Sequence, residues 1–270
     1  MYDFKFHNPD SLAAALESCS QAEDGQFMAG GQTMIPVMKQ RLSMPSDVID
    51  LGSVEDLKGI SVADGVVSIG AMTTHALVAA DGDVQRAIPV LAALAGGIGD
   101  PHVRNRGTLG GSIANNDPAA DYPAALLALG ANVHTDRRQI AADDFFTGMF
   151  ETALEEGELA IRVDFPVPKA AGYAKFGNPA SRYAMVGVFV SQGSDGVRVA
   201  VTGAAPCVFR ISEMEKALSN NFSPAAIKDM TVPAADLNND IHASAEYRAH
   251  LIGVMAARAV GDAILREGAA

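Results

Sequence analysis

The sequence predicts an α+β fold, because strand-like and helix-like segments are mixed in it without strict alternation. Segments of both kinds occur up to about residue 167, strand-like segments then dominate, and the chain closes on helical patterns. With 270 residues, 49% of them hydrophobic, the chain is long enough to bury a core and to form two packed domains.

The first segments predict a strand, helix, strand, glycine turn and helix in that order. Residues 2–6 alternate like a short strand, and the Pro9-Asp10-Ser11 turn begins an amphipathic helix. The glycine turn Gly30-Gly31 lies between an apolar strand and a helical segment that starts near residue 33, where Pro36 is tolerated in the first turn. A further strand is expected over residues 47–52.

The remaining elements follow the same patterns. We expect strands at 66–73 and 159–167 and helices at 74–80, 84–95 and 118–129, with the second glycine-rich stretch between two of these helices. Residues 166–172 are typical of a linker. Beyond it, three strand-like segments joined by turns precede helices at 211–219 and 244–265.

Charge and residue counts exclude several classes of function. A formal net charge of -12 argues against nucleic acid as a partner, because phosphate backbones are bound by surplus Lys and Arg. Two widely separated cysteines, Cys19 and Cys207, cannot supply an iron–sulfur cluster, and the six histidines have no metal-ligand spacing. No signal peptide or span of roughly 18 apolar residues is present, so we expect no membrane span and a cytoplasmic location.

The first glycine turn, in the segment AGGQTM, predicts an anion site. A turn that leaves a strand and opens a helix exposes free amides, and glycine allows an anion to approach them closely. The segment fits neither GxGxxG nor the P-loop pattern. A tight turn that needs glycine only for its backbone angles is an equally good explanation of this segment alone.

A second turn of the same kind occurs almost eighty residues later, in Thr108-Leu109-Gly110-Gly111-Ser112. If the two turns converge, their amides would hold a diphosphate from both sides, which suits an acidic protein. Two unrelated surface loops are the alternative.

Farther on, Asp117 is expected to cap a helix with Pro118 at its first position. Asp121, one turn later, either favours the helix dipole or accepts hydrogen bonds from ligand hydroxyls.

Four segments together resemble the FAD-binding medium subunit of the molybdenum hydroxylases, the group of carbon monoxide dehydrogenase and xanthine dehydrogenase. They are AGGQTMIPVMKQRL, VRNRGTLGGSIANNDPAADYPAALLALGA, NPASRYAMVGV and DIHASAEYRAHL, in the same order as in the family. The resemblance implies an FAD-binding domain of the vanillyl-alcohol oxidase type over residues 1–167, with α/β subdomains at about 1–54 and 55–167. It also implies a C-terminal α+β domain over 172–270, with a small antiparallel sheet and helices.

The same resemblance implies the residues that bind FAD. One wall would be Ala29, Gly30, Gly31, Gln32 and Thr33, and the other Thr108, Gly110, Gly111 and Ser112. Asp121 corresponds to the acid that contacts the ribityl chain, and Tyr183 to an aromatic that covers the flavin ring, although an ordinary tyrosine at a domain boundary is the alternative. Lys175 is a candidate for a polar contact near the cofactor. No catalytic residue and no metal ligand is implied.

Partners are implied as well. Family members work with an iron–sulfur small subunit that carries two [2Fe-2S] clusters and a large subunit that carries the molybdenum cofactor, as a dimer of heterotrimers. The chain would then accept electrons from the clusters and pass them to an acceptor such as NAD+ or a quinone. Two other hypotheses stay open: a standalone FAD-dependent oxidase or reductase of the same fold, and a non-enzymatic module that binds another diphosphate ligand or assists assembly.

Overall fold

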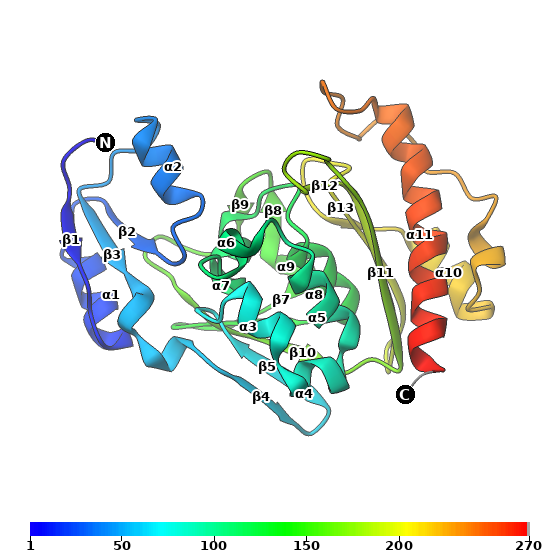
Figure 1. Cartoon of the computed structure of the whole chain (residues 1–270), viewed down its shortest axis with the longest axis horizontal. Helices are drawn as coiled ribbons and strands as arrows, with labels where there is room; N and C mark the ends of the chain where they lie inside the picture. The colour runs from blue at the N-terminus through cyan, green and yellow to red at the C-terminus, as the bar shows by residue number, and fades with distance from the viewer. Residues whose placement is uncertain (269–270) are drawn as a thin grey trace.

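The N-terminal fifty residues form a small parallel sheet with strand order β1-β3-β2 (Figure 1). Its elements are β1 (Lys5–His7), α1 (Leu12–Ser20), β2 (Gly25–Met28), α2 (Met34–Lys39) and β3 (Asp47–Asp50). Ser11 caps α1 by accepting a hydrogen bond from the amide of Ala14. The central strand β3 buries Val48 and Ile49. The predicted order of elements is therefore confirmed, with slightly shorter bounds.

A second unit, built on a five-stranded antiparallel sheet of order β4-β5-β10-β6-β7, follows in the computed structural model, which describes residues 1–268. The strands are β4 (Ile60–Ala63), β5 (Val66–Gly70), β6 (Asn132–Thr135), β7 (Gln139–Ala141) and β10 (Ala160–Pro166). Its helices are α3 (His75–Ala80), α4 (Gly82–Ala87), α5 (Pro89–Gly96), α6 (Pro101–Arg104), α7 (Leu109–Asn115), α8 (Tyr122–Leu129) and α9 (Ala142–Phe145). Short 3-10 turns (Leu51–Ser53, Glu55–Leu57) and a hairpin of β8 (Phe146–Gly148) and β9 (Glu151–Thr152) complete it.

The C-terminal unit is a four-stranded antiparallel sheet covered by helices on both faces. Its strands are β11 (Ala170–Gly177), β12 (Ala184–Gly193), β13 (Gly196–Thr202) and β14 (Phe209–Arg210), and its helical segments are α10 (Ser212–Asn220), a 3-10 turn (Pro224–Ile227) and α11 (Ala245–Glu267). Successive side chains of a strand point to opposite faces. Phe189 therefore joins the core around α8, whereas Val188 and Val190 join the core under α11.

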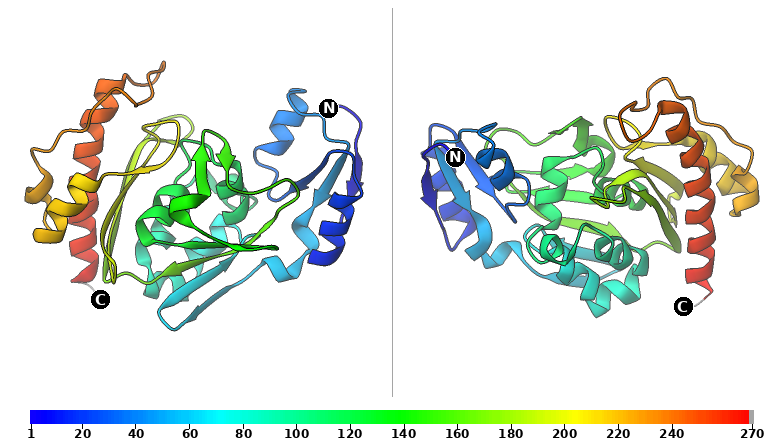
Figure 2. Two further views of the ribbon diagram at one scale, coloured as in Figure 1. Left: turned by 180° about the vertical axis from the view of Figure 1, so that it is seen from behind. Right: turned by 45° about the horizontal axis from the view of Figure 1, so that its top comes forward.

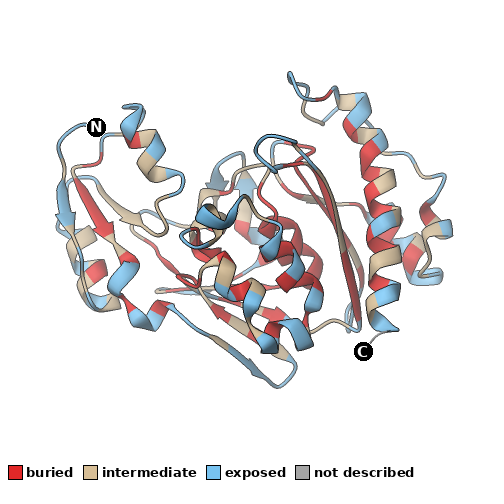
Figure 3. Cartoon of the chain, viewed as in Figure 1, coloured by how far each residue is buried: buried red, intermediate tan, exposed pale blue. Residues whose placement is uncertain are grey.

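The three units lie in a row (Figures 1 and 2). Figures 1 and 2 show the N-terminal sheet at one end, α11 at the other, and the five-stranded sheet between them. The buried residues concentrate on α8, on the central strands of the C-terminal sheet and on one face of α11 (Figure 3). No helix within residues 1–268 combines the length and the apolar character needed to cross a membrane.

Three local predictions were wrong. The helix expected at 84–95 is two helices, because Pro89 has no amide hydrogen to continue the first. The helix expected from Pro118 begins at Tyr122, and Asp117 instead accepts a hydrogen bond from the amide of Ala119 in a turn. The linker expected at 166–172 is shorter, since β11 already starts at Ala170. The second glycine stretch lies between α5 and α8, as expected, and itself forms the additional helix α7.

Candidate functional site

The two glycine turns lie in contact. A Cβ atom placed on Gly30 would lie 2.0 Å from the carbonyl oxygen of Arg106 and 2.9 Å from Cα of Gly107. A Cβ atom on Gly111 would lie 3.2 Å from Cβ of Ala29. Real Cβ atoms do not tolerate the first of these distances, so the close approach of the two backbones depends on glycine at position 30. The two glycine turns therefore converge, which a site that holds one ligand from both sides requires.

The amides of the first turn are available to a ligand. Within residues 1–268, the N–H groups of residues 30–34 have no protein acceptor. Residues 30–32 form the turn before α2, and the amides of Thr33 and Met34 belong to those that a helix start cannot pair internally. Five unpaired main-chain donors on one turn are suited to bind an anionic oxygen without a basic side chain.

The amides of the second turn are engaged within the protein. Residues 109–112 donate to the carbonyl oxygens of Thr73, Ala71 and Thr108 and to the hydroxyl of Thr108, which caps α7. The expectation that both turns offer free amides therefore holds for the first turn and not for residues 109–112. The second turn contributes the main chain of Gly111 to the cleft, beside Thr108 and Ser112, whereas Gly110 is buried against Ala71.

A cleft of about 620 Å³ opens where the two turns meet. This volume lies in the range of about 300–1,000 Å³ that is usual for ligand sites. Eleven of the twelve predicted site residues line it: Ala29, Gly30, Gly31, Gln32, Thr33, Thr108, Gly110, Gly111, Ser112, Asp121 and Tyr183. The sequence prediction thus selected residues that the fold gathers around one cavity from three separate parts of the chain.

The twelfth residue, Lys175, reaches this cleft only through Asp121. Its Nζ lies 3.0 Å from Oδ1 of Asp121 and donates to the carbonyl oxygen of Gly97 at 3.1 Å. The hydroxyl of Tyr173 donates to the same carboxylate. Burial raises the pKa of Asp121, while the Lys175 ammonium and the Tyr173 hydroxyl act in the opposite direction. The cleft therefore has a buried carboxylate in its wall, fixed by two side chains of β11.

Tyr183 stands at the turn between β11 and β12, where Ser181 and Arg182 also line the cleft. Its side chain is 51% exposed. Partial burial and the carboxylates of Asp117 and Asp121 raise the pKa of the Tyr183 phenol. The phenol is therefore neutral at physiological pH and presents an aromatic surface at the edge of the cleft.

Several parts of the lining were not predicted from the sequence, including His75 and a segment before β10. His75 is 4% exposed, and burial, with a contribution from Arg104, lowers its pKa to about 4, so the imidazole is neutral. A segment before β10 supplies Leu154, Glu158, Leu159 and Ala160. No local pattern marks these residues, since their position depends on strand pairing between distant parts of the chain. Within residues 1–268, no group of three His, Cys, Asp or Glu side chains is placed to hold a metal ion.

Comparison with known proteins identifies the family to which this chain belongs. The family model of the FAD binding domain in molybdopterin dehydrogenase matches residues 2–168. The nicotine 6-hydroxylase medium subunit of Paenarthrobacter nicotinovorans is 36% identical, with 96% of each chain covered. The carbon monoxide dehydrogenase medium chain of Hydrogenophaga pseudoflava is 32% identical, with 97% of this chain and 98% of that one covered. This chain belongs to the molybdopterin dehydrogenase FAD-binding family.

Solved structures agree with this assignment to the family. Carbon monoxide dehydrogenase from H. pseudoflava superposes with a TM-score of 0.88 at 32% identity, over 98% of both chains. Quinoline 2-oxidoreductase from Pseudomonas putida 86 gives a TM-score of 0.89 at 28% identity, again over 98% of both. The predicted family is confirmed, as is the predicted fold class, an α+β protein whose FAD-binding domain is of the vanillyl-alcohol oxidase type.

The cofactor of the molybdopterin dehydrogenase FAD-binding family fits the chemistry of the cleft. FAD carries a diphosphate, which needs hydrogen-bond donors, and the free amides of residues 30–34 provide them. Gly111 keeps the two turns close together on the cleft wall, since a Cβ there would meet Thr108 Oγ1 at 3.0 Å and Cβ of Ala29 at 3.2 Å. The rest of the wall is largely apolar, as at Phe27, Leu51 and Met72, and suits aromatic rings.

Proposed function

We propose that this chain is the FAD-binding electron-transfer subunit of a heteromeric molybdenum-containing dehydrogenase or hydroxylase. The contact of the two glycine turns around one cleft carries this proposal, together with likeness to medium subunits over nearly the whole chain. FAD, when bound, supplies an electron carrier, and the protein supplies binding, orientation and electrostatics. No protein nucleophile or general base is needed, which agrees with a cleft wall made of main chain, hydroxyls and apolar groups.

Each part of the cleft has a proposed role. Amides of residues 30–34 hold the diphosphate, with Thr108 and Ser112 offering hydroxyls from the opposite turn. Asp121 accepts hydrogen bonds from the ribityl hydroxyls, and Lys175 keeps that carboxylate ionised and oriented. Tyr183 covers one face of the flavin ring system. These roles are supported by the position of each group on the cleft wall.

The assembly and the path of electrons follow from the relatives. Subunits of carbon monoxide dehydrogenase and nicotine 6-hydroxylase are named medium chains, which implies companion chains. For this protein we infer a small subunit with [2Fe-2S] clusters and a large subunit with the molybdenum cofactor, in a cytoplasmic dimer of heterotrimers. Electrons from the clusters would reach this chain and leave to an external acceptor such as NAD+ or a quinone.

The proposed domain division is 1–167 and 172–270, with subdomains at about 1–54 and 55–167. It is supported by the sheets, since the parallel sheet ends at Asp50, the five-stranded sheet at Pro166, and the C-terminal sheet begins at Ala170. FAD would then lie where the N-terminal unit and the five-stranded sheet meet, with the β11–β12 turn over one end.

Replacement of Gly111 by valine tests the location of FAD. The side chain would project toward Ala29 and Thr108 and close the gap between the turns, so the purified Gly111→Val protein should contain little FAD by absorbance. Gly261→Val is the matched control, because no atom lies within 4 Å of a Cβ at that position. A folded Gly111→Val protein with a full complement of FAD would contradict the proposed site.

Native mass spectrometry of the complex, with cofactor analysis of each subunit, tests the assembly. The expected result is this chain with one FAD, bound to an iron–sulfur chain and a molybdenum-containing chain. Oxidation of an organic substrate by the isolated protein would instead favour the standalone oxidase or reductase.

A further inference from the structure

One wall of the FAD cleft has no regular structure of its own. Residues 153–159 connect the short strand β9 to β10, and Leu154, Glu158, Leu159 and Ala160 line the cleft. Only a few main-chain hydrogen bonds hold this segment, such as that from the amide of Ala153 to the carbonyl oxygen of Phe145, so its conformation also depends on side-chain contacts.

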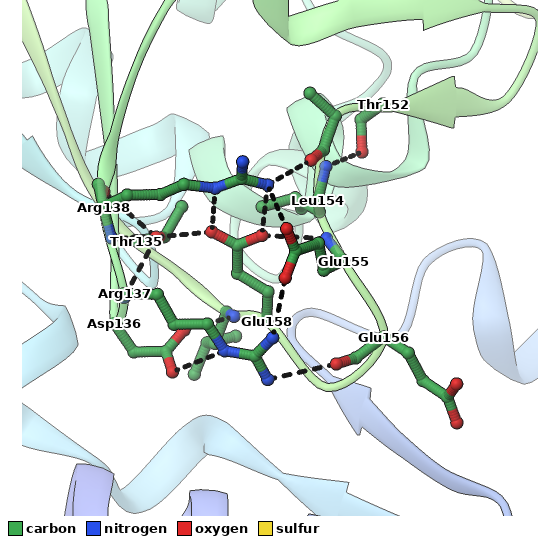
Figure 4. Close-up of polar contacts among 11 residues, drawn as sticks. Thr135, Asp136, Arg137, Arg138, Thr152, Leu154, Glu155, Glu156 and Glu158 are labelled. Carbon is green, nitrogen blue, oxygen red and sulfur yellow. Dashed lines mark hydrogen bonds and ion pairs between the residues drawn. The ribbon is translucent and has the colours of Figure 1, made fainter.

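Arg138 Nη2 donates to the carbonyl oxygen of Ala153 at 2.7 Å, and the carboxylate of Glu158 accepts four further hydrogen bonds. Its side chain is fully buried, and it accepts hydrogen bonds from both Nε and Nη2 of Arg138, at 3.0 and 2.9 Å. Thr135 Oγ1 and the amide of Glu155 donate at 2.7 and 2.8 Å. Figure 4 shows these four bonds converging on one carboxylate from the β6–β7 turn and from the wall segment. The bidentate pair with the Arg138 guanidinium fixes the orientation of the carboxylate.

A second connection lies directly beside the first. The amide of Leu159 donates to Oδ1 of Asp136 at 2.7 Å, and the amide of Asp136 donates to the carbonyl oxygen of Leu159 at 3.0 Å. The Leu159 side chain belongs to the same buried cluster as Ala15 of α1 and Ile49 of β3. The wall is therefore bound on one side to the β6–β7 turn and on the other to the N-terminal sheet.

We propose that Glu158 is a positioning residue for the cofactor: by joining Arg138 and Thr135 to the amide of Glu155, it holds the 153–160 wall in the shape that FAD requires. This inference rests on the proposed location of FAD in the cleft. Ion pairs in the outer part of the cluster, such as that of Arg137 with Glu155, are exposed and contribute little to holding the wall.

Neighbouring charges support this assignment. Glu156 lies in the same segment, but only its carbonyl oxygen is bonded, to Arg137, and its carboxylate points away from the cluster in Figure 4. Hydrogen bonding from Arg138, the Glu155 amide and Thr135 lowers the pKa of Glu158 to about 2, so the carboxylate stays ionised at any pH at which the complex would work. Glu156→Gln is thus a matched control for Glu158→Gln.

The test uses the full-length protein freed of FAD, with two measurements on Glu158→Gln, Glu156→Gln and Leu218→Ala. Leu218 is buried in the C-terminal core, so its truncation lowers stability without touching the wall. Hydrogen exchange reports the amides of Glu155 and Leu159, and quenching of flavin fluorescence gives the Kd for FAD. Arg138→Lys, which keeps the charge but loses the two-pronged bond, replaces Glu158→Gln if that variant fails to fold.

For Glu158→Gln we expect faster exchange at both amides and a Kd for FAD raised at least about tenfold. Glu156→Gln and Leu218→Ala should stay within about twofold of the wild-type Kd. Wild-type exchange or affinity in Glu158→Gln, or an equal loss of affinity in Leu218→Ala, would overturn the inference. Its failure is distinguishable from failure of the FAD site, since Gly111→Val tests the site without touching the wall.

Discussion

Lys175 Nζ lies 3.0 Å from Oδ1 of Asp121, and this buried ion pair joins strand β11 to the start of helix α8. It connects the C-terminal sheet to the wall of the cleft proposed to bind FAD, because Asp121 lines that cleft and Lys175 does not. The pair is almost fully shielded, with 15% and 4% of the two side chains exposed. Its removal should therefore affect both the stability of the protein and the binding of FAD.

Lys175→Met should destabilise the protein by about 3–5 kcal/mol at pH 7, since it leaves a buried carboxylate without its cation. Burial already raises the pKa of Asp121, and loss of Lys175 raises it further. A raised folded-state pKa favours the folded form at low pH, and this benefit is lost as pH rises through that pKa. The destabilisation should therefore shrink between pH 7 and pH 5, as measured by urea unfolding.

The exposed pair of Lys169 with Glu267 provides the control for that experiment. Lys169→Met should change the free energy of unfolding by less than about 1 kcal/mol at either pH. An equal loss of stability in Lys175→Met at pH 7 and pH 5 would contradict the role assigned to the buried carboxylate.

Gly30→Ala should separate the two glycine turns. The added Cβ would lie 2.0 Å from the carbonyl oxygen of Arg106, which is main chain and cannot rotate away. We expect loss of FAD from the purified protein and a lower unfolding midpoint. Gly261→Ala, in the middle of α11, has open space around its Cβ and should instead stabilise the protein by about 0.5–1 kcal/mol. Wild-type FAD content in Gly30→Ala would mean that the turns can separate without harm to the site.

The sequence predicted the glycine turns because their signal is local, and it failed where a distant segment decides the outcome. The start of α8 is an example: Asp117 and Pro118 form a good helix start, yet Thr202 Oγ1 and the Gly203 amide donate to the carbonyl oxygen of Pro118. Those contacts with β13 hold residues 118–120 in a turn, and α8 begins at Tyr122. Pairing across the tertiary structure here outweighed the local capping preference.

The wall of the cleft was missed for the same physical reason. Arg138 and Glu158 are twenty residues apart and belong to no motif, so their contact appears only once β6 and β10 are paired. The free amides of residues 30–34 were predictable, whereas the engagement of residues 109–112 with Ala71 and Thr73 was not. By contrast, the break at Pro89 between α4 and α5 was available from the sequence and was overlooked.

Tyr183→Ala should weaken FAD binding without unfolding the protein. Its side chain is half exposed, so truncation should change the free energy of unfolding by no more than about 0.5 kcal/mol. Stacking of an aromatic ring contributes about 0.5–1.5 kcal/mol, which corresponds to a rise of about 2- to 12-fold in the Kd for FAD. Flavin fluorescence titration measures this. Tyr247→Ala, which removes a tyrosine of similar exposure from α11, should leave the Kd unchanged.

His75 should make the stability of the FAD-free protein depend on pH between about 4 and 6.5. Burial lowers its pKa to about 4 from the usual 6.5, so in this range the unfolded chain binds a proton that the folded protein does not. Stability therefore rises as pH rises from 4 to 6.5, by about 3 kcal/mol at most, and is level above that range. Because other groups also titrate here, the decisive quantity is the difference between wild type and His75→Gln. In urea unfolding at pH 4.5, 5.5 and 7, the free energy of unfolding of His75→Gln should lie closest to that of the wild type at pH 4.5. A difference that stays constant across the three values would show that His75 is not held neutral in the cleft wall.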